Sequence, residues 1–321
     1  MNQIWKNGMM GVVLGDCLGM PVQFLPREEI KKNPVKTMEG YGTYNMPPGT
    51  WSDDSSMALA TLFSLKENNR VDYDDIMKRF VCWVYNGEYT PAGVSFDMGN
   101  TCLGAINEYI HSKNYLSCGK TGERANGNGA LMRIMPICLY AYERVKKEKW
   151  TIKNAMDHIH QTSALTHNHL RSKMACGIYF FMVCSILDKE GTLQERLQAG
   201  VDDAIRFYHG DIANYTQLAY YSRLFHLDEL AECQEPEIKS TGYVVDSLEA
   251  AVWSLITTDS LKEALLRAVN LGDDTDTIGA IAGLAGLYYG YESAPEEWRT
   301  SIIKEADIME LCEIMEEKQN A

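Results

Sequence analysis

Apolar residues recur every three to four positions along most of this chain, with polar residues between them. This spacing places the apolar side chains on one face of a helix. It predicts helices over residues 55–66, 73–85, 129–146, 152–165, 170–187, 193–208, 245–256, 261–269 and 278–289. Segments that alternate apolar and polar residues between tight turns, as strands do, are nearly absent. We therefore expect an all-α fold, a compact bundle of many helices.

Several long irregular stretches separate the predicted helices, at residues 25–50, 86–95, 114–128 and 230–242. Loops of this length in a compact protein commonly carry binding residues. No change of composition, repeat or low-complexity segment divides the 321 residues. The sequence thus predicts a single domain, residues 1–321, whose loops gather over one site.

The chain is acidic, with 44 Asp and Glu against 30 Lys and Arg and a formal charge of −14. Nucleic acids and anionic membrane surfaces are bound through Lys and Arg side chains, so this balance disfavours both as partners. The nine cysteines include no Cys-x-x-Cys pair, which favours a reducing compartment. The apolar stretches at residues 174–187 and 278–290 are shorter than the ~20 residues of a membrane span, and the first apolar run ends at Asp16, too early for a signal peptide. We expect a cytoplasmic protein that does not enter the membrane.

Two clusters of Asp, Ser and Thr residues, at residues 50–55 and 271–277, each precede a strongly apolar predicted helix. One interpretation is helix capping, because these side chains accept hydrogen bonds from the first free N–H groups of a helix. The other is a metal site, because carboxylates crowded at buried helix starts repel one another unless a cation lies between them. Such oxygen ligands suit Mg²⁺ or Mn²⁺, and neither cluster has the spacing of a calcium loop or a neighbouring Cys or His for zinc. The spacing alone leaves both interpretations open.

A series of short motifs also resembles a known family, the ADP-ribosylglycohydrolases, which include dinitrogenase-reductase-activating glycohydrolase and the ADP-ribosyl-arginine and ADP-ribosyl-serine hydrolases. Each motif is weak by itself, but all follow one another in the family's order. They lie at residues 11–19, 51–55, 96–101, 127–133, 166–169, 242–246 and 268–278.

The resemblance implies an all-helical domain whose cleft holds two Mg²⁺ or Mn²⁺ ions. The ligands that it implies are Ser52, Asp53 and Asp54 for one ion and Asp274, Asp276 and Thr277 for the other. Paired cations could hold the 2′ and 3′ hydroxyls of a ribose and orient a water near its anomeric carbon. Asp273 stands where the family usually has glycine, so we interpret it as a surface or supporting acid and not as a ligand.

Two further residues match positions of catalytic interest. Asp97 by itself could be a helix cap, but it resembles the family carboxylate that contacts the substrate ribose, where a base could accept a proton. Gln23 follows the Asp-x-x-Gly segment at a position where the family commonly has Glu. An amide cannot act as a general base, so Gln23 raises the alternative of weak turnover.

The remaining matches concern substrate binding. Gly127, Asn128 and Gly129 resemble a phosphate cradle at the start of a helix, although glycines there could equally form a flexible turn. A histidine before a helix or a tyrosine among apolar neighbours is ordinarily structural, and the family match is what favours a substrate contact. The implied substrate-binding residues are Gly99, Asn100, Thr101, Glu123, Gly127, Asn128, Gly129, His167 and Tyr243. The glycines at positions 279, 283, 286 and 290 predict a central core helix that other helices approach closely.

The favoured function is a metal-dependent hydrolase that removes ADP-ribose from an ADP-ribosylated protein, with arginine as the expected linkage. The first alternative is a protein that binds ADP-ribose or neutralises a transferase with weak or no turnover. The second is a helical di-metal phosphohydrolase, which would cut the diphosphate instead of the glycosidic bond.

Overall fold

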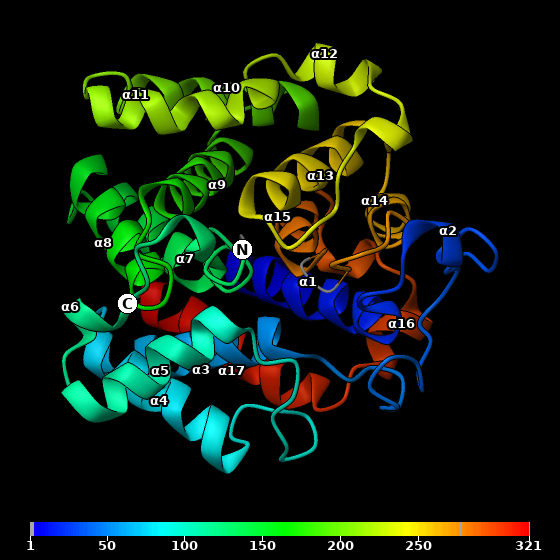
Figure 1. Ribbon diagram of the computed structural model, residues 1–321, viewed down its shortest axis with the longest axis horizontal. Coiled ribbons are helices and arrows are strands. Elements are labelled where there is room, and N and C mark those ends of the chain that lie inside the picture. The colour runs from blue at the N-terminus through cyan, green and yellow to red at the C-terminus, as the bar shows by residue number, and fades with distance from the viewer. Residues whose placement is uncertain (1–2, 276–277, 321) are drawn as a thin grey trace.

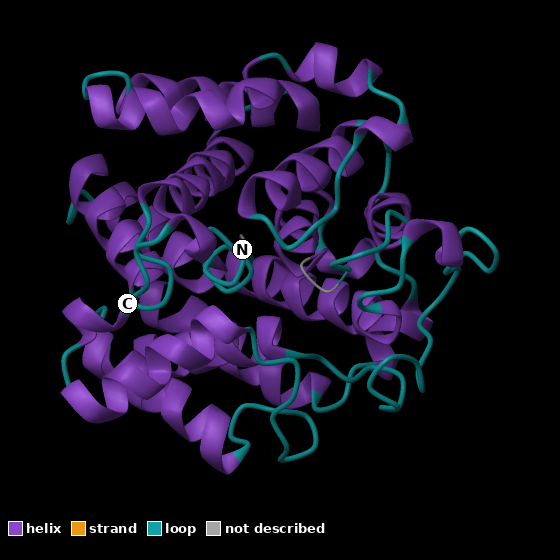
Figure 2. Ribbon diagram, viewed as in Figure 1, coloured by secondary structure: helices purple, strands orange, loops and turns teal. Residues whose placement is uncertain are grey.

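The computed structural model describes residues 3–275 and 278–320, with the side chains of residues 319 and 320 left undescribed. Within these residues the chain forms seventeen α-helices and five short 3-10 helices (Figures 1 and 2). No strand occurs in this described part, and its two isolated bridges join Lys120 to His167 and Gly127 to Tyr243. The predicted all-α fold is confirmed.

Helices of two turns or more carry most of the fold. They are α1 (Ile4–Gly19), α3 (Asp53–Asn68), α4 (Tyr73–Asn86), α5 (Asn100–Ser112), α7 (Met135–Lys146), α8 (Ile152–Ala164), α9 (Leu170–Asp188), α10 (Leu193–Tyr208), α13 (Val244–Ile256), α14 (Leu261–Val269), α15 (Ile278–Tyr289) and α17 (Glu305–Asn320). Shorter helices lie in the connections: α2 (Arg27–Ile30), α6 (Tyr115–Cys118), α11 (Ile212–Leu218), α12 (Leu227–Glu232) and α16 (Glu296–Ser301).

Most predicted helix bounds agree with the structure to within two residues. The prediction for residues 129–146 is wrong at its start, because α7 begins at Met135 and residues 130–133 form turns. Pro136 explains this start, since a proline fits the first turn of a helix but not its interior. The sequence pattern also missed α1, in which every residue from Gly8 to Gly19 is buried, so no polar face marks the helical period.

Helices α1 and α15 pack backbone against backbone in the middle of the molecule (Figure 1). A Cβ atom on Gly11 would lie 2.3 Å from the carbonyl oxygen of Ala282, and one on Gly286 would lie 2.2 Å from that of Asn7. No side chain fits at either place, so glycine allows the two helices to touch. The prediction that the glycine series marks a core helix is confirmed for this part of α15.

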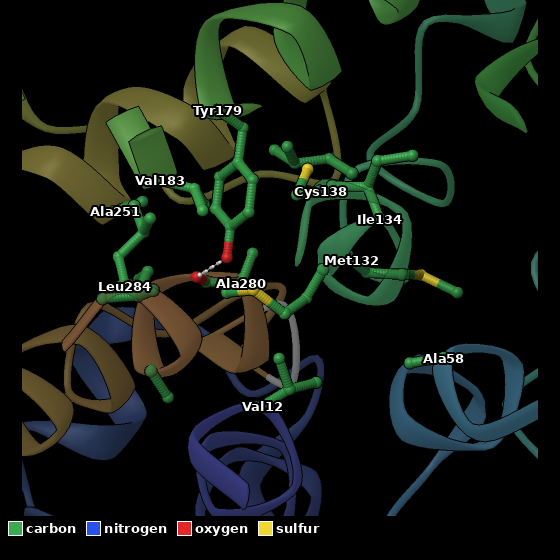
Figure 3. Close-up of a cluster of buried hydrophobic side chains, with 14 of the residues drawn as sticks. Val12, Ala58, Met132, Ile134, Cys138, Tyr179, Val183, Ala251, Ala280 and Leu284 are labelled. Atoms are coloured by element: carbon green, nitrogen blue, oxygen red, sulfur yellow. Dashed lines mark hydrogen bonds between the residues drawn. The ribbon is translucent and has the colours of Figure 1, made fainter. Parts of the chain in front are cut away.

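Buried side chains from α1, α7, α9 and α15 meet in the hydrophobic cluster drawn in Figure 3. Its polar member, Tyr179, donates a hydrogen bond of 2.7 Å to the carbonyl oxygen of Ala280. Helix α9, with 19 residues, is long and apolar enough to cross a membrane, but 78% of its most apolar window is buried within the protein. Its placement between α8 and α10 is that of a core helix.

The irregular segments and several helix starts converge on one region. Figure 2 shows coil segments in the middle of the view, between the group of α3 to α6 and the helices around α15. Helices α3 and α5 begin there, and residues 274 and 275 lead toward α15. The fold therefore brings the two acidic clusters to one place, as the site below shows in detail.

Candidate active site

The acidic residues line a cleft of about 550 Å³, a volume within the range of small-ligand sites. Segments from distant parts of the sequence contribute to it. The lining residues are Gln23, Phe24, Tyr44, Asp53, Asp54, Asp97, Met98, Gly99, Asn100, Thr101, Cys102, Gly127, Asn128, Gly129, Met132, His167 and Asp274. Most of the predicted site residues are thus brought together, and no Lys or Arg occurs among these described lining residues.

The first cluster forms the N-terminus of α3. Ser52 is the N-cap, and its side chain accepts a hydrogen bond from the N–H of Asp54, so part of the capping interpretation is correct. Asp53 and Asp54 belong to the first turn and are almost fully buried. Capping needs only Ser52, which leaves two buried carboxylates to be explained.

Asp16 supports this cluster from the end of α1, a role that the sequence analysis did not assign. Its carboxylate is buried and accepts hydrogen bonds from the backbone N–H of Ser52 at 2.9 Å and of Ser55 at 2.9 Å. Burial raises the pKa of Asp16 to about 6, although these hydrogen bonds oppose the shift. The only sequence sign of this role was the position of Asp16 within the family motif at residues 11–19.

The second cluster reaches the cleft through Asp274. Gln23 connects its side-chain amide to this loop at both ends: Nε2 donates to Oδ1 of Asp274 at 2.8 Å, and Oε1 accepts from the N–H of Thr275 at 2.7 Å. Asp273 is exposed and has a φ of +62°, a backbone conformation that glycine adopts more readily. Its predicted position at the surface is confirmed. The predicted ligands Asp276 and Thr277 lie outside the described residues.

Asp97 joins the carboxylates from a third segment. The capping interpretation is wrong for this residue, because the N-cap of α5 is Gly99. Asp97 instead has a φ of +55°, and its Oδ2 atom is buried without a hydrogen-bond partner among the described residues. A strained backbone and an unsatisfied carboxylate oxygen are typical of a functional site.

The electrostatics show how closely these acids lie. Burial raises the pKa of Asp53 well above its usual value, and the charges of Asp97, Asp16 and Asp274 raise it further. Burial also raises the pKa of Asp54 well above its usual value, and the charges of Asp53, Asp16, Asp274 and Asp97 raise it further. Buried carboxylates that raise one another's pKa repel when they are ionised. A positive charge between them would relieve this repulsion.

The residues present fit divalent cations. Oδ2 of Asp54, like that of Asp97, is a buried oxygen without a hydrogen-bond partner in the described part of the chain. Carboxylate and hydroxyl oxygens are the ligands that Mg²⁺ and Mn²⁺ prefer. Within residues 3–275 and 278–320, no three His, Cys, Asp or Glu side chains are grouped to hold an ion by themselves. The predicted ligand set also includes Asp276, so the described residues supply only part of it.

The glycine loop at residues 127–129 lines the same cleft. The N–H of Asn128 donates to the carbonyl oxygen of Gly242 at 3.0 Å, so this N–H is not available for a phosphate. The side-chain amide of Asn128 donates to Oδ2 of Asp274 and to Ser247. Since α7 starts only at Met135, the loop does not stand directly at a helix N-terminus as predicted. Asn128 has a supporting role that the sequence analysis missed.

Other predicted substrate residues divide into two groups. Gly99, Asn100, Thr101 and His167 line the cleft, whereas Glu123 and Tyr243 are not among its lining residues. These two meet instead at Arg171, a residue that is 4% exposed. Its Nη1 donates to Oε2 of Glu123 and to the hydroxyl of Tyr243, each at 3.1 Å. His169 is the N-cap of α9, so the helix-end interpretation holds for it.

Comparisons with known proteins identify the family of this chain. The family model for ADP-ribosylglycohydrolase matches residues 5–321. Over 310 residues the chain is 31% identical to the ADP-ribosylarginine hydrolase Tri1 of Serratia proteamaculans, covering 96% of this chain and 77% of the relative. It is 30% identical to the ADP-ribosyl-[dinitrogen reductase] glycohydrolase of Rhodospirillum rubrum, covering 91% of this chain and 88% of the relative.

Among solved structures, an ADP-ribosylglycohydrolase-related protein complex superimposes with a TM-score of 0.77 and 28% identity. The match covers 98% of this chain and 97% of the other. The family model spans the acidic clusters, Asp97 and the glycine loop, so it covers every segment that lines the cleft. The chain belongs to the ADP-ribosylglycohydrolase family of hydrolases.

Proposed function

We propose that this protein is a metal-dependent hydrolase that removes ADP-ribose from modified arginine side chains of a protein. The observation that carries the proposal is the meeting of Asp53, Asp54, Asp97 and Asp274 in one cleft without a lining Lys or Arg among the described residues. The relatives from Serratia and Rhodospirillum, whose names specify ADP-ribosylarginine and ADP-ribosylated dinitrogen reductase, support a protein substrate. The arginine linkage follows from the first of these names.

Divalent cations would be held by Ser52, Asp53, Asp54 and Asp274, together with the predicted Asp276 and Thr277. When bound, two such ions would supply charge stabilisation and a fixed position for ribose hydroxyls and water. The protein itself prepares this site by holding the carboxylates in place before any ligand arrives. Asp16, Gln23 and Asn128 do so through the hydrogen bonds described above.

Asp97 is the group that fits proton transfer. Its unsatisfied Oδ2 can accept a proton from the attacking water while the water oxygen bonds to the anomeric carbon. The bond from that carbon to the guanidino nitrogen breaks with its electron pair on nitrogen, and this nitrogen takes up one proton while Asp97 gives up the proton that it received from the water. Free ADP-ribose and unmodified arginine result, so atoms and charge balance. Gln23 has both ends of its amide engaged with Asp274 and Thr275, a geometry suited to holding the loop.

Product mass tests the reaction. Purified protein with Mg²⁺ or Mn²⁺ should release ADP-ribose from ADP-ribosylarginine protein and restore the unmodified side chain. A phosphohydrolase would leave phosphoribose on the target. Intact arginine-, serine- and nucleobase-linked substrates, combined with tight ADP-ribose binding, would favour the binding-protein alternative.

A pair of Asp→Asn variants tests the role of Asp97. Asp97→Asn should remove most turnover while ADP-ribose binding stays measurable. Asp273→Asn is the matched control, because Asp273 is exposed, does not line the cleft and has a backbone conformation that asparagine tolerates. Equal activity of both variants would refute the assignment of Asp97.

The cellular role follows from the same reaction. We propose a cytoplasmic enzyme whose target is a protein that accumulates ADP-ribose when the gene is deleted. Mass spectrometry of ADP-ribosylated peptides from the deletion strain would identify this target and its linkage. Cell fractionation with a tagged chain tests the location.

A further inference from the structure

A fully buried guanidinium lies behind the cleft. Arg133 has no exposed surface, and its guanidinium carbon lies 4.9 Å from the centre of the Phe80 ring. No described carboxylate forms an ion pair with it, and its Nε and Nη1 have no hydrogen-bond partner among the described residues. Burying an unpaired charge is unfavourable for folding, so this placement requires another explanation.

The one nitrogen of Arg133 that is engaged points to a threonine hydroxyl. Nη2 donates to Oγ1 of Thr166 at 2.9 Å and to the carbonyl oxygen of Thr162 at 3.2 Å. Oγ1 of Thr166 in turn lies 2.9 Å from Nδ1 of His167. The three residues form a chain of hydrogen bonds that runs from the buried cation to the cleft.

This chain determines where the imidazole proton lies. Arg133 can only donate, so Oγ1 of Thr166 accepts from Nη2, and the single proton of this hydroxyl has Nδ1 of His167 as its hydrogen-bond acceptor. Nδ1 is then an acceptor, and the neutral ring carries its proton on Nε2. In the other tautomer, His167 and Arg133 would both donate to the same oxygen, and the Thr166 proton would lose Nδ1 as an acceptor and be left, among the described residues, with the weakly accepting sulfur of Cys102.

The ring stays neutral and fixed. Burial, assisted by the charge of Arg133, lowers the pKa of His167 to about 3. Its backbone is anchored to Ser163, whose carbonyl accepts from the N–H of His167 at 2.9 Å and whose hydroxyl donates to the His167 carbonyl at 3.1 Å. The imidazole therefore keeps one protonation state and one position.

The Nε2 side of this ring faces the glycine loop. A Cβ atom on Gly129 would lie 2.8 Å from Cε1 of His167, and one on Gly127 would lie 3.5 Å from its Nε2. A side chain at Gly129 would therefore collide with the imidazole. The absence of side chains on this loop leaves His167 facing the cleft that both glycines line.

We propose that Arg133 and Thr166 are positioning residues that hold His167 as the neutral Nε2–H tautomer, which donates a hydrogen bond to a substrate oxygen beside the glycine loop. The identity of that oxygen, as part of ADP-ribose, rests on the function proposed above. Arginine suits the inner end of this chain of hydrogen bonds because its guanidinium stays protonated and can only donate. The hydroxyl of Thr166 therefore accepts from Arg133 and stays directed at Nδ1 of His167.

The tautomer can be measured without any substrate. Nitrogen NMR of histidine-labelled protein distinguishes the protonated from the unprotonated ring nitrogen, and a His167→Gln sample assigns the His167 signals among the seven histidines. We expect wild-type His167 to carry its proton on Nε2. Thr166→Val should mix the tautomers, and Thr166→Ser should restore the wild-type pattern. A proton on Nδ1 in the wild type would overturn the proposal.

Binding of ADP-ribose, measured by calorimetry, gives the functional readout. Loss of one oriented hydrogen bond should weaken binding about tenfold in Thr166→Val, and Thr166→Ser should restore it. Thr162→Val is the matched control, because its buried hydroxyl donates to the carbonyl of His158 and takes no part in the chain. Equal losses in Thr166→Val and Thr162→Val would overturn the proposal.

The two proposals fail in different ways. An Nε2–H tautomer that changes in Thr166→Val, in a protein that does not bind ADP-ribose, would confirm the positioning by Arg133 and Thr166 and refute the proposed function. ADP-ribose binding and hydrolysis with a wild-type His167 protonated on Nδ1 would do the reverse.

Discussion

The contact between α1 and α15 predicts that a methyl group at Gly11 destabilises the protein, although alanine favours helices. The Cβ of Gly11→Ala would lie 2.3 Å from the carbonyl oxygen of Ala282 and 3.0 Å from its carbonyl carbon. Both atoms belong to the backbone of α15, so no side-chain rotation can relieve the contact. The helices must move apart.

The magnitude follows from two opposing terms. Alanine in place of glycine inside a helix contributes up to about 1 kcal/mol through its higher helix propensity. Overpacking a rigid contact costs about 1–3 kcal/mol, and a backbone-to-backbone contact belongs at the upper end. We therefore expect Gly11→Ala to lower the free energy of unfolding by about 2 kcal/mol.

Gly8→Ala is the matched control on the same helix. Its Cβ would meet the side-chain ends of Leu139 at 3.1 Å and Met135 at 3.2 Å, which can shift by a few tenths of an ångström. We expect this variant to be about as stable as the wild type or slightly more stable. Urea denaturation with a common slope measures both values.

The two variants also separate packing from function. Helix α1 ends close to Asp16 and Gln23, and α15 starts after the second acidic cluster, so moving these helices apart should also weaken Mn²⁺ binding in Gly11→Ala. Gly8→Ala should bind Mn²⁺ normally. If Gly11→Ala and Gly8→Ala unfold at the same urea concentration, the backbone contact does not limit the packing of these helices and the reasoning is refuted.

Three further predictions concern buried acids. In thermal melts, Mg²⁺ or Mn²⁺ at about one hundred times its Kd should stabilise the protein by about 2.7 kcal/mol relative to EDTA. Asp54→Asn should raise the stability of the metal-free protein and reduce the gain from metal. An unchanged gain would contradict a cation at Asp54. Gln23→Glu replaces the amide that donates to Asp274 with a second carboxylate, so the stability of the metal-free protein should fall by about 1–3 kcal/mol and recover with Mg²⁺. Equal melting temperatures of variant and wild type in EDTA would show that the amide contact is unimportant. Burial raises the pKa of Glu143 from 4.5 to about 8, so between these pH values the folded protein holds more protons than the unfolded chain and loses stability as the pH rises. Glu143→Gln should remove this loss, which is on the order of 2 kcal/mol between pH 5 and 8. Parallel stability profiles of variant and wild type against pH would show that Glu143 does not cause the loss.

The spacing of apolar residues predicted helices that have a polar face and also the almost wholly buried α15, but it missed α5, which has one buried face. Helices α10 and α14 have clear polar faces and match their predicted bounds. Helix α1 is buried on all sides, so its apolar pattern has no period from which to read a helix. The start of α7 was misplaced because residues 130–133 extend the apolar spacing of the helix in the sequence but form turns in the structure.

The candidate site was predictable as a set of residues and not as a geometry. The sequence indicated helix starts at Asp53 and near Asp274. The family resemblance predicted that these two acidic clusters lie together. The left-handed backbone of Asp97 was not visible, since a residue before an apolar run is ordinarily a cap. Nor could the sequence show that the side chain of Asn128 binds a carboxylate, because that contact joins residues far apart in the chain.

The end of α1 explains how two acidic clusters so distant in sequence acquire a fixed separation. Asp16 binds the N–H groups at the start of α3, which carries Asp53 and Asp54. Less than two turns later along the chain, the carbonyl of Gly19 accepts a hydrogen bond of 2.8 Å from the hydroxyl of Thr275, and Gln23 holds Asp274. Among the described residues, both clusters are therefore held by hydrogen bonds to the same short segment, residues 16–23. Because like charges repel, direct contact between the clusters could not hold them in place without a cation, whereas a shared neighbour can.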